Sequence, residues 1–268
     1  MPIECDADVE PVIEAAFKEM DYEIMSFIFA IHNDLGRLCD EKVYQKELVF
    51  HCERMGFESV LTELPIRVWH RDFEKILYVD LFINNGMPYE MKTVSTLTGG
   101  HRAQTLNYLL LLGLQHGKLV NMRARSVQHR FVSTSLTRKD RYEYSMNDKD
   151  WINMDAPVVD LRALVSGLVE DWGMFLSTSL YCDAIEHFLG GRERVVQRAD
   201  LFDGDRMLGA QQMHFLAPDI AFHISGVSEG EEWYRKHLAR LVQHTRLKAL
   251  QWVNFDRHII TFRTIVPQ

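Results

Sequence analysis

The stretch that decides the fold is Tyr78-Val-Asp-Leu-Phe-Ile-Asn-Asn-Gly-Met-Pro-Tyr-Glu-Met-Lys92. Two largely apolar runs flank Asn-Asn-Gly, which predicts a β-hairpin. Asp80 interrupts the first run, where an acid is costly unless it is paired or bound to a metal. Glu90 and Lys92 are two residues apart, so they share one face of the second strand.

The length of the turn decides whether Asp80 joins that face. A two-residue turn pairs residues whose numbers sum to 171, which puts Asp80 and Glu90 on opposite faces. A three-residue loop over 84–86, with Gly86 in the left-handed conformation, pairs residues that sum to 170 and sets Asp80 opposite Glu90. We predict the three-residue loop, because only that register gathers two carboxylates and an ammonium at one point.

Two carboxylates at one point suit a hard divalent cation such as Mg²⁺ or Mn²⁺. Such an ion polarises a phosphodiester and lowers the pKa of bound water. Lys92 would orient that water and stabilise developing negative charge. The alternative interpretation of Asp80, Glu90 and Lys92 is a structural salt-bridge network.

The apolar spacing in the first half predicts a mixed α/β unit with the order αβββαβ. Helices are expected over 9–33, 39–55 and 101–112, and strands over 60–69, 76–83, 88–94 and 118–122. Gly56 and Gly113 would end the second and third of these helices.

A polar stretch over 145–157 predicts a boundary, which gives domains over 1–148 and 149–268. The second domain is expected to be a smaller α+β unit. Its expected helices are 158–190 and 230–244, and its expected strands are 194–202, 207–216, 220–227, 250–255 and 258–266, the last two joined by Asp256-Arg257.

Further residues extend the hairpin pattern on both sides. Glu41 and Tyr44 lie three apart on the preceding helix, and Gln104 and Tyr108 lie four apart on the following one. These positions occur in order in Leu35-Gly-Arg-Leu-Cys-Asp-Glu-Lys-Val-Tyr44, Tyr78-Val-Asp-Leu81, Glu90-Met-Lys92 and His101-Arg-Ala-Gln-Thr-Leu-Asn-Tyr-Leu109.

Over about residues 25–130 this combination resembles the GxxExxY protein family, a RecB-like branch of the PD-(D/E)xK nuclease superfamily. The glycine that names the motif would fall at position 38, where this chain has Leu38, and Gly36 matches an earlier glycine of the loop. The second half resembles the extension of longer family members, to which no activity is assigned.

The resemblance implies a role for each site residue. Asp80 and Glu90 would bind the metal, and Glu41 would complete or support the metal shell. Lys92 would be the catalytic lysine. Gln104 and Tyr108 match the QxxxY element beside the site of RecB-like nucleases.

The charge is unevenly distributed around a net value of −8. Residues 1–34 hold nine acids and one lysine, whereas residues 118–141 hold seven basic residues and one acid. A basic stripe over 118–141 would track phosphates, and the alternative is a solvated surface strand and loop.

Other features narrow the class of protein. The longest run of leucines, Leu109–Leu112, is far shorter than a membrane span, and the acidic start has no secretory pattern. The four cysteines lack disulfide or zinc spacing. We therefore expect a cytoplasmic protein with reduced thiols and no membrane segment.

The expected function is a nuclease dependent on Mg²⁺ or Mn²⁺ that acts on nucleic acid, on DNA more than RNA. The alternative is a catalytically silent nuclease-fold module that binds nucleic acid or a partner protein. A homo-oligomer or a protein partner would use the C-terminal domain. The sequence leaves open whether cleavage is at ends or internal.

Overall fold

The structure, a computed structural model, describes residues 2–154 and 160–267. The chain divides into two compact units of mixed α/β structure, each with its own six-stranded sheet. The first unit comprises Met1–Trp69 and Glu74–Asp140, and the second comprises His70–Phe73 and Arg141–Gln268.

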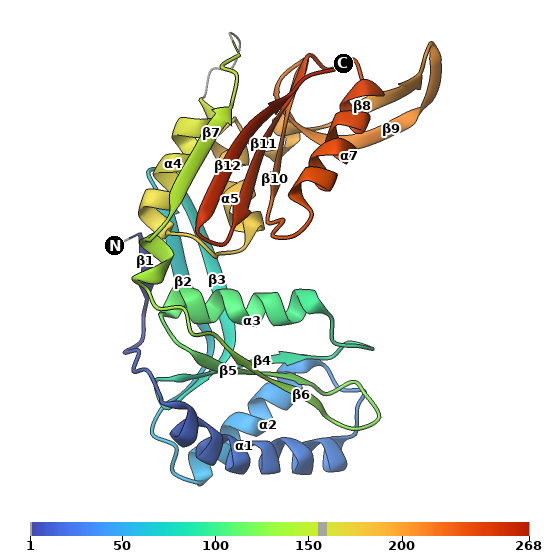
Figure 1. Cartoon of the computed structure of the whole chain (residues 1–268). Helices are drawn as coiled ribbons and strands as arrows, with labels where there is room; N and C mark the ends of the chain where they lie inside the picture. The colour runs from blue at the N-terminus through green and yellow to red at the C-terminus, as the bar shows by residue number, and fades with distance from the viewer. Residues whose placement is uncertain (1, 155–159, 268) are drawn as a thin grey trace. The chain divides into compact units, whose positions relative to one another are not determined.

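The first unit contains the predicted αβββαβ order. Its elements are β1 (Ile3–Cys5), α1 (Glu14–Leu35), α2 (Glu41–Arg54), β2 (Val60–His70), β3 (Phe73–Ile83), β4 (Met87–Lys92), α3 (Gly99–Leu112), β5 (His116–Asn121) and β6 (Gln128–Ser133). The strands follow one another across the sheet in sequence order, so the unpredicted β1 and β6 are its two edges. Helices α1 and α2 lie on one side of the sheet and α3 on the other (Figure 1).

Strand β4 shows how the sequence sorts its side chains between these two layers. Tyr89 and Met91 belong to the hydrophobic core that includes Phe17, Ile24 and other residues of α1 and α2. Because side chains alternate along a strand, the intervening polar residues must face the opposite layer, where α3 lies. Burial of the apolar face therefore sets which way the acidic face of the hairpin points.

The β3–β4 hairpin has the predicted register. Leu81 pairs with Tyr89 and Ile83 with Met87, so the three-residue loop is confirmed. The expected left-handed Gly86 is wrong: Asn84 and Asn85 have φ values of 48° and 56° instead. Asparagine tolerates this conformation better than most residues, since its short amide can bond locally.

Gly86 has a different physical reason to be glycine. A Cβ built there would lie 2.2 Å from the carbonyl oxygen of Glu10 and 2.5 Å from a methyl of Val12. The segment that leads into α1 crosses the loop at this point, and the Glu10 N–H donates to the Asn85 carbonyl at 2.8 Å. The hairpin loop is thus fixed by an acidic segment distant from it in sequence.

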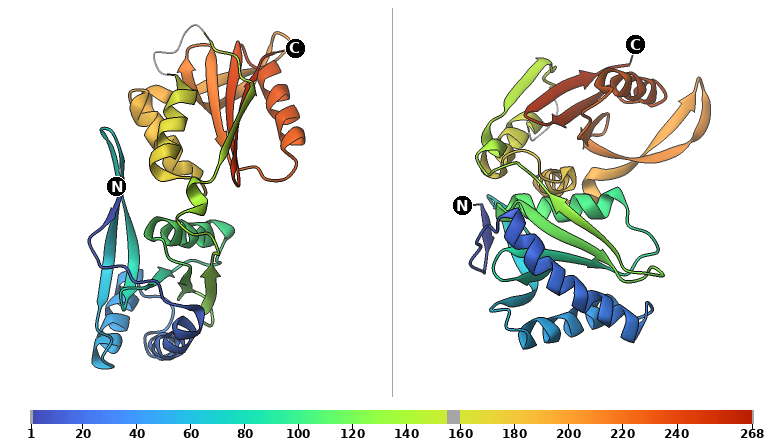
Figure 2. Two further views of the ribbon diagram at one scale, coloured as in Figure 1. Left: turned by 60° about the vertical axis from the view of Figure 1, so that its left-hand side comes forward. Right: turned by 60° about the horizontal axis from the view of Figure 1, so that its bottom comes forward.

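The second unit has helices on both faces of its sheet (Figure 2). Its elements are the 3₁₀ turn η1 (Asp140–Tyr142), which begins at the last residue of the first unit, then β7 (Ser145–Asp150), α4 (Leu161–Trp172), α5 (Thr178–Phe188), α6 (Arg192–Val195), β8 (Val196–Asp203), β9 (Arg206–Ala217), β10 (Ile220–Ser225), α7 (Glu231–Gln243), β11 (Ala249–Asp256) and β12 (Ile259–Ile265). The strand order is β7-β12-β11-β10-β9-β8, with β10–β11 and β7–β12 parallel. The expected α+β character of this region is confirmed.

Three expectations for the second unit need correction. The predicted helix over 158–190 is two helices, because Gly173 has φ of 74° and its place against the Arg141 backbone leaves no room for a Cβ. The stretch 145–157 contains β7, whose six residues are all exposed and show no apolar alternation. The last hairpin turns at Arg257-His258, since Asp256 pairs with Ile259. The end of the predicted polar stretch and the start of the predicted helix fall on residues 155–159, which lie outside the described residues.

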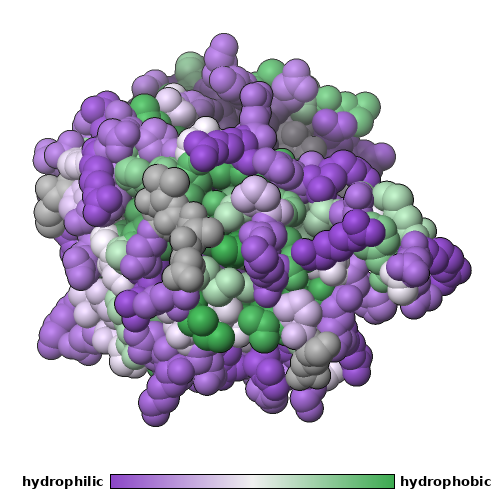
Figure 3. All heavy atoms as spheres, turned by 90° about the horizontal axis from the view of Figure 1, so that it is seen from above, coloured by the Kyte–Doolittle hydropathy of each residue, from purple (hydrophilic) through white to green (hydrophobic). Residues whose placement is uncertain are grey.

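The helices and the surface of the protein can be compared with the expectation of no membrane segment. No helix in residues 2–154 and 160–267 is long and apolar enough to cross a membrane. The face shown in Figure 3 is mostly hydrophilic, with hydrophobic residues near its centre and in smaller groups toward its upper and right edges. The structure has Cys5, Cys39, Cys52 and Cys182 as free thiols.

Candidate active site

The hairpin brings three charged side chains to one point. The Lys92 ammonium contacts a carboxylate oxygen of Glu90 and lies 3.5 Å from Oδ2 of Asp80. The same Asp80 oxygen accepts a hydrogen bond of 2.8 Å from the Met91 N–H. Asp80 therefore faces the same side of the sheet as Glu90 and Lys92, which is the arrangement that the three-residue loop requires.

Burial makes the negative charges of this group costly. Only 1% of Glu90 and 8% of Asp80 are exposed. Desolvation, followed by the nearby Asp80 charge, raises the pKa of Glu90 to about 8, although Lys92 opposes the shift. Desolvation also raises the pKa of Asp80 against the influence of Lys92. For Lys92, desolvation lowers the pKa, but the two carboxylates outweigh it and the net shift is upward.

Glu41, at the start of α2, lies beside this group. Desolvation raises the pKa of Glu41, and the Asp80 charge adds to that shift, whereas Lys92 and the Thr93 N–H lower it. The electrostatic interaction is mutual, since Glu41 also raises the pKa of Glu90. The structure therefore brings Glu41 near Asp80, Glu90 and Lys92, although it stands on another element.

Glu63 of β2 is a further carboxylate near the group that the sequence reasoning missed. Its charge raises the pKa of both Asp80 and Glu41. Its φ of 51° is unusual for a strand residue other than glycine, and such strained positions often occur at functional sites. Glu63 stands two residues before a proline within a strand pattern, and that irregularity was the available signal.

Helix α3 contributes Gln104 and Tyr108. The amide nitrogen of Gln104 donates to the Tyr108 hydroxyl at 2.9 Å. Desolvation raises the pKa of Tyr108 to about 12, the Gln104 bond lowers it, and the charges of Glu90 and Asp80 add to the rise. The pair thus lies within the electrostatic reach of the carboxylates. A capping box of Thr98 and His101 begins the helix.

Tyr44, the tyrosine of the Glu41 motif, has a structural position. Its side chain is fully buried in the α1–α2 core. Its hydroxyl donates to the Gly36 carbonyl at 2.8 Å and accepts from the Cys39 N–H at 3.1 Å. Tyr44 therefore holds the loop that precedes α2, which positions Glu41 at the start of that helix.

The predicted basic stripe over 118–141 is not continuous at the surface. Lys118 is buried and forms an ion pair of 2.5 Å with Asp21 of α1, which also accepts a hydrogen bond from Tyr89. Arg141 is buried and donates to the Trp172 carbonyl. Two of the seven basic side chains are therefore buried and paired inside the protein. Their partners, Asp21 and the Trp172 carbonyl, are distant in sequence, so the spacing of the basic residues does not reveal them.

The residues present can be compared with what a divalent cation requires. No group of three His, Cys, Asp or Glu side chains within residues 2–154 and 160–267 is close enough together to hold a metal. Asp80 and Glu90 nevertheless offer hard oxygen ligands, and the buried Oε2 of Glu90 has no hydrogen-bond partner among the residues that the structure describes. An unsatisfied buried carboxylate oxygen is costly, and a cation would relieve that cost. The two carboxylates therefore have the oxygen chemistry that a hard divalent cation takes, and any further ligands would have to come from water.

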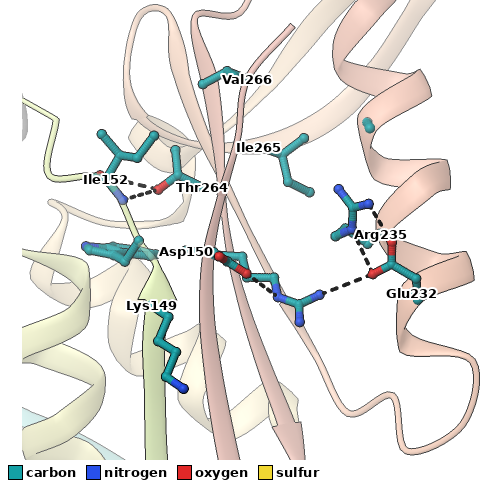
Figure 4. Close-up of a pocket in the computed structure, with 11 residues that line it drawn as sticks. Lys149, Asp150, Ile152, Glu232, Arg235, Thr264, Ile265 and Val266 are labelled. Atoms are coloured by element: carbon teal, nitrogen blue, oxygen red, sulfur yellow. Dashed lines mark hydrogen bonds and ion pairs between the residues drawn. The ribbon is translucent and has the colours of Figure 1, made fainter. Parts of the chain in front are cut away.

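The second unit contains a separate pocket of about 650 Å³ between β7, β12 and α7 (Figure 4). Arg263 lies 3.4 Å from Asp150 and 3.4 Å from Glu231, and Arg235 donates to Glu232 at 2.9 Å. The charged lining residues are thus three basic ones, Lys149, Arg235 and Arg263, and two acidic ones, Asp150 and Glu232. Both arginines are held in ion pairs with nearby carboxylates.

Comparison with known proteins bears on the first unit. Residues 18–132 match the family model of the PD-(D/E)XK nuclease superfamily, and this range includes Glu41, Asp80, Glu90, Lys92, Gln104 and Tyr108. No curated protein and no solved structure matches the chain. Residues 18–132 are therefore similar to a PD-(D/E)XK nuclease superfamily domain.

Proposed function

We propose that this protein is a nuclease dependent on Mg²⁺ or Mn²⁺ that hydrolyses phosphodiester bonds in DNA, and that it belongs to the GxxExxY branch of its superfamily. The match of residues 18–132 supports phosphodiester cleavage and a nucleic-acid substrate. The preference for DNA and the choice of metal are further parts of the proposal.

The observation that carries the proposal is the buried Oε2 of Glu90, which lies beside Asp80 and Lys92 and accepts no hydrogen bond from the described part of the chain. A purely structural network would satisfy its buried acceptors. An acceptor left open next to a second carboxylate is instead ready to bind a cation. Active sites also often contain several residues whose pKa values are shifted together by burial and by specific charged partners.

Each residue has a role in the proposed reaction. Asp80 and Glu90 would hold the metal, with Glu41 supporting them from α2. When bound, the metal would supply Lewis-acid activation of the phosphate and of a water molecule. Lys92 would orient the attacking water and stabilise negative charge on the phosphate oxygens. Gln104 would fix the Tyr108 hydroxyl, which then donates a hydrogen bond toward the substrate.

The test is a cleavage assay with Mg²⁺ or Mn²⁺ on linear, circular and single-stranded DNA and on RNA. Asp80→Ala and Lys92→Ala should each lower the rate at least about a hundredfold, as for loss of one stabilising group in a transition state. Glu53→Ala and Lys46→Ala change exposed charges of α2 and should leave the rate unchanged. Equal rates for all four variants would refute the proposal.

A specific observation favours the alternative, a silent module that binds nucleic acid or a partner protein. The Lys92 ammonium already contacts both carboxylates, and the described residues hold no ready three-ligand group. In that case the region 149–268 would supply the surface for a protein partner or a second copy. Binding of DNA without cleavage of any substrate would support this alternative.

A further inference from the structure

A pocket of about 370 Å³ lies at the β6 edge of the first sheet. Six residues line it: Thr96, Leu97, Val127, Gln128, His129 and Arg130. Thr96 and Leu97 belong to the segment that connects the end of β4, at Lys92, to the start of α3. The pocket is therefore one short loop away from the candidate active site.

Strand register places part of this pocket on the face of the active site. Glu90 pairs with Leu119 on β5, which pairs with Arg130 on β6. Lys92 pairs in the same way with Asn121, and Asn121 with Gln128. Paired residues in a sheet point to the same side, so Arg130 and Gln128 share the face of the two site residues.

A side-chain bond confirms this direction. The amide nitrogen of Asn121 donates to Oε1 of Gln128 at 3.0 Å and to the Val94 carbonyl at 2.8 Å. Gln128 therefore uses its oxygen internally and presents its NH₂ group as two donors. His129 points to the other side of the sheet, where its ring contacts Phe29 of α1.

The polar groups of the pocket select an anion. Arg130 is exposed, and no hydrogen bond or ion pair of its guanidinium is formed within the described part of the chain. None of the six described lining residues is acidic. An exposed guanidinium beside an amide NH₂ is suited to a phosphate, because two phosphate oxygens can accept a parallel pair of hydrogen bonds from the planar guanidinium.

We propose that this pocket binds a backbone phosphate of the nucleic-acid strand that enters the active site, with Arg130 as its main contact and Gln128 as a second donor. The proposal rests on the proposed function. Two strand spacings separate Glu90 from Arg130, about 10 Å. That distance corresponds to about three phosphates at the rise of a B-form strand. Arg130 is thus a positioning residue that sets how the strand lies across the sheet.

The experiment measures binding of a fluorescein-labelled oligothymidylate of about 20 nucleotides by anisotropy, in EDTA, between 50 and 200 mM NaCl. Arg130→Gln should weaken binding about tenfold at the lower salt, as expected for loss of one charge-assisted contact. It should also reduce the slope of log K against log salt by about 0.7. Arg130→Lys should keep the wild-type slope, because the positive charge remains.

The matched control is Arg54→Gln, which removes an exposed arginine from α2 on the opposite side of the sheet. It should change neither affinity nor slope. Equal slopes for Arg130→Gln and wild type, or no binding of the oligonucleotide by wild type, would overturn the proposal. Competition by inorganic phosphate as effective as that by unlabelled oligonucleotide would also overturn it, since the pocket would then be a free-phosphate site.

The outcomes separate this proposal from the proposed function. If Lys92→Ala abolishes cleavage while Arg130→Gln binds with the wild-type slope, the nuclease stands and the phosphate contact is rejected. If Arg130→Gln lowers the slope but wild type cleaves nothing, the phosphate contact stands and the catalytic proposal is rejected.

Discussion

At the scale of single residues, Glu90 occupies a buried position that disfavours its charged form. Burial and the Asp80 charge raise its pKa to about 8, so near neutral pH the carboxyl group holds a proton that a free glutamate would release. The two carboxylates are not equivalent, because Asp80 accepts a backbone hydrogen bond and Glu90 keeps one oxygen unpartnered. The raised pKa of Glu90 should therefore make the stability of the protein depend on pH.

In metal-free buffer, wild type should lose stability relative to Glu90→Gln as the pH rises from about 5 to 9. The unfolded chain ionises Glu90 near its ordinary value of 4.5, whereas the folded chain does so near 8. The stability that the raised pKa of Glu90 contributes is thus fully present below pH 4.5 and is lost as the pH rises through 8. Urea unfolding of both proteins across this range measures the effect, and parallel stability curves would contradict the shift.

Asp21 is a second residue whose role depends on burial. It accepts from Tyr89 at 2.7 Å and pairs with the Lys118 ammonium, whose side chain is only 5% exposed. Removing one partner of a buried ion pair leaves an uncompensated charge. We expect Asp21→Asn to destabilise the first unit by about 3–5 kcal/mol.

The double variant Asp21→Asn with Lys118→Met should recover most of that loss, since it removes the unpaired ammonium as well. Denaturant unfolding of the single and double variants measures the coupling. Additive losses in the double variant would show that the two side chains do not act as a pair.

At the scale of elements, the β3–β4 hairpin determines the site. Its register was predictable because side chains alternate along a strand, and a slip of one residue would separate Asp80 from Glu90. The conformation of the loop was not predictable. Asn84 and Asn85 take the left-handed conformation, while Gly86 is required by the chain segment that crosses it.

Gly86→Ala should therefore destabilise the first unit by about 1–3 kcal/mol, in the range of overpacking, because its Cβ would meet backbone rather than a flexible side chain. The control is Gly99→Ala in the first turn of α3, where, apart from the adjoining residues and the backbone of the helix itself, no described atom lies within 4 Å of the added Cβ. That variant should be neutral or slightly stabilising. Thermal unfolding compares the two, and similar melting temperatures would argue against the close contact with Glu10.

At the scale of the whole molecule, the two units have separate cores. One core joins α1, α2 and the first sheet, and a different one joins α7 and the second sheet. The predicted metal ligands all belong to the first unit. A ligand that binds only the folded state stabilises the part that holds it, by about 2.7 kcal/mol at a hundred times its dissociation constant.

We expect calorimetry to give two transitions, or one broader than a two-state process allows. Ile28→Ala should lower the free energy of unfolding of the first unit by about 2–5 kcal/mol, and Leu250→Ala that of the second, since each opens a cavity in a different core. Each variant should therefore lower the midpoint temperature of a different transition. Mn²⁺ should raise only the transition that Ile28→Ala lowers. An equal Mn²⁺ shift of both transitions would place the metal outside the proposed site.

The geometry of the candidate active site could be predicted largely from the sequence, because strand alternation and loop length are local properties. The spacing of Glu90 and Lys92 fixes a common strand face, and the three-residue loop fixes the partner of that face. The αβββαβ order followed from the apolar periodicity, for the same local reason. The exposed strand β7 lacks that periodicity, and the break between α4 and α5 depends on the Arg141 backbone, so neither was predicted.

By itself, the sequence determined the order of elements in the nuclease-like domain, the hairpin register and the acidic and basic groups that meet on one strand face. Only the tertiary structure decided that Glu63 lies within electrostatic reach of the carboxylates, that Lys118 pairs with Asp21, and that Arg130 lines a pocket. The physical reason is that strand alternation acts between neighbouring residues. Burial and ion pairing instead depend on which distant segments pack together, and spacing along the chain does not record that.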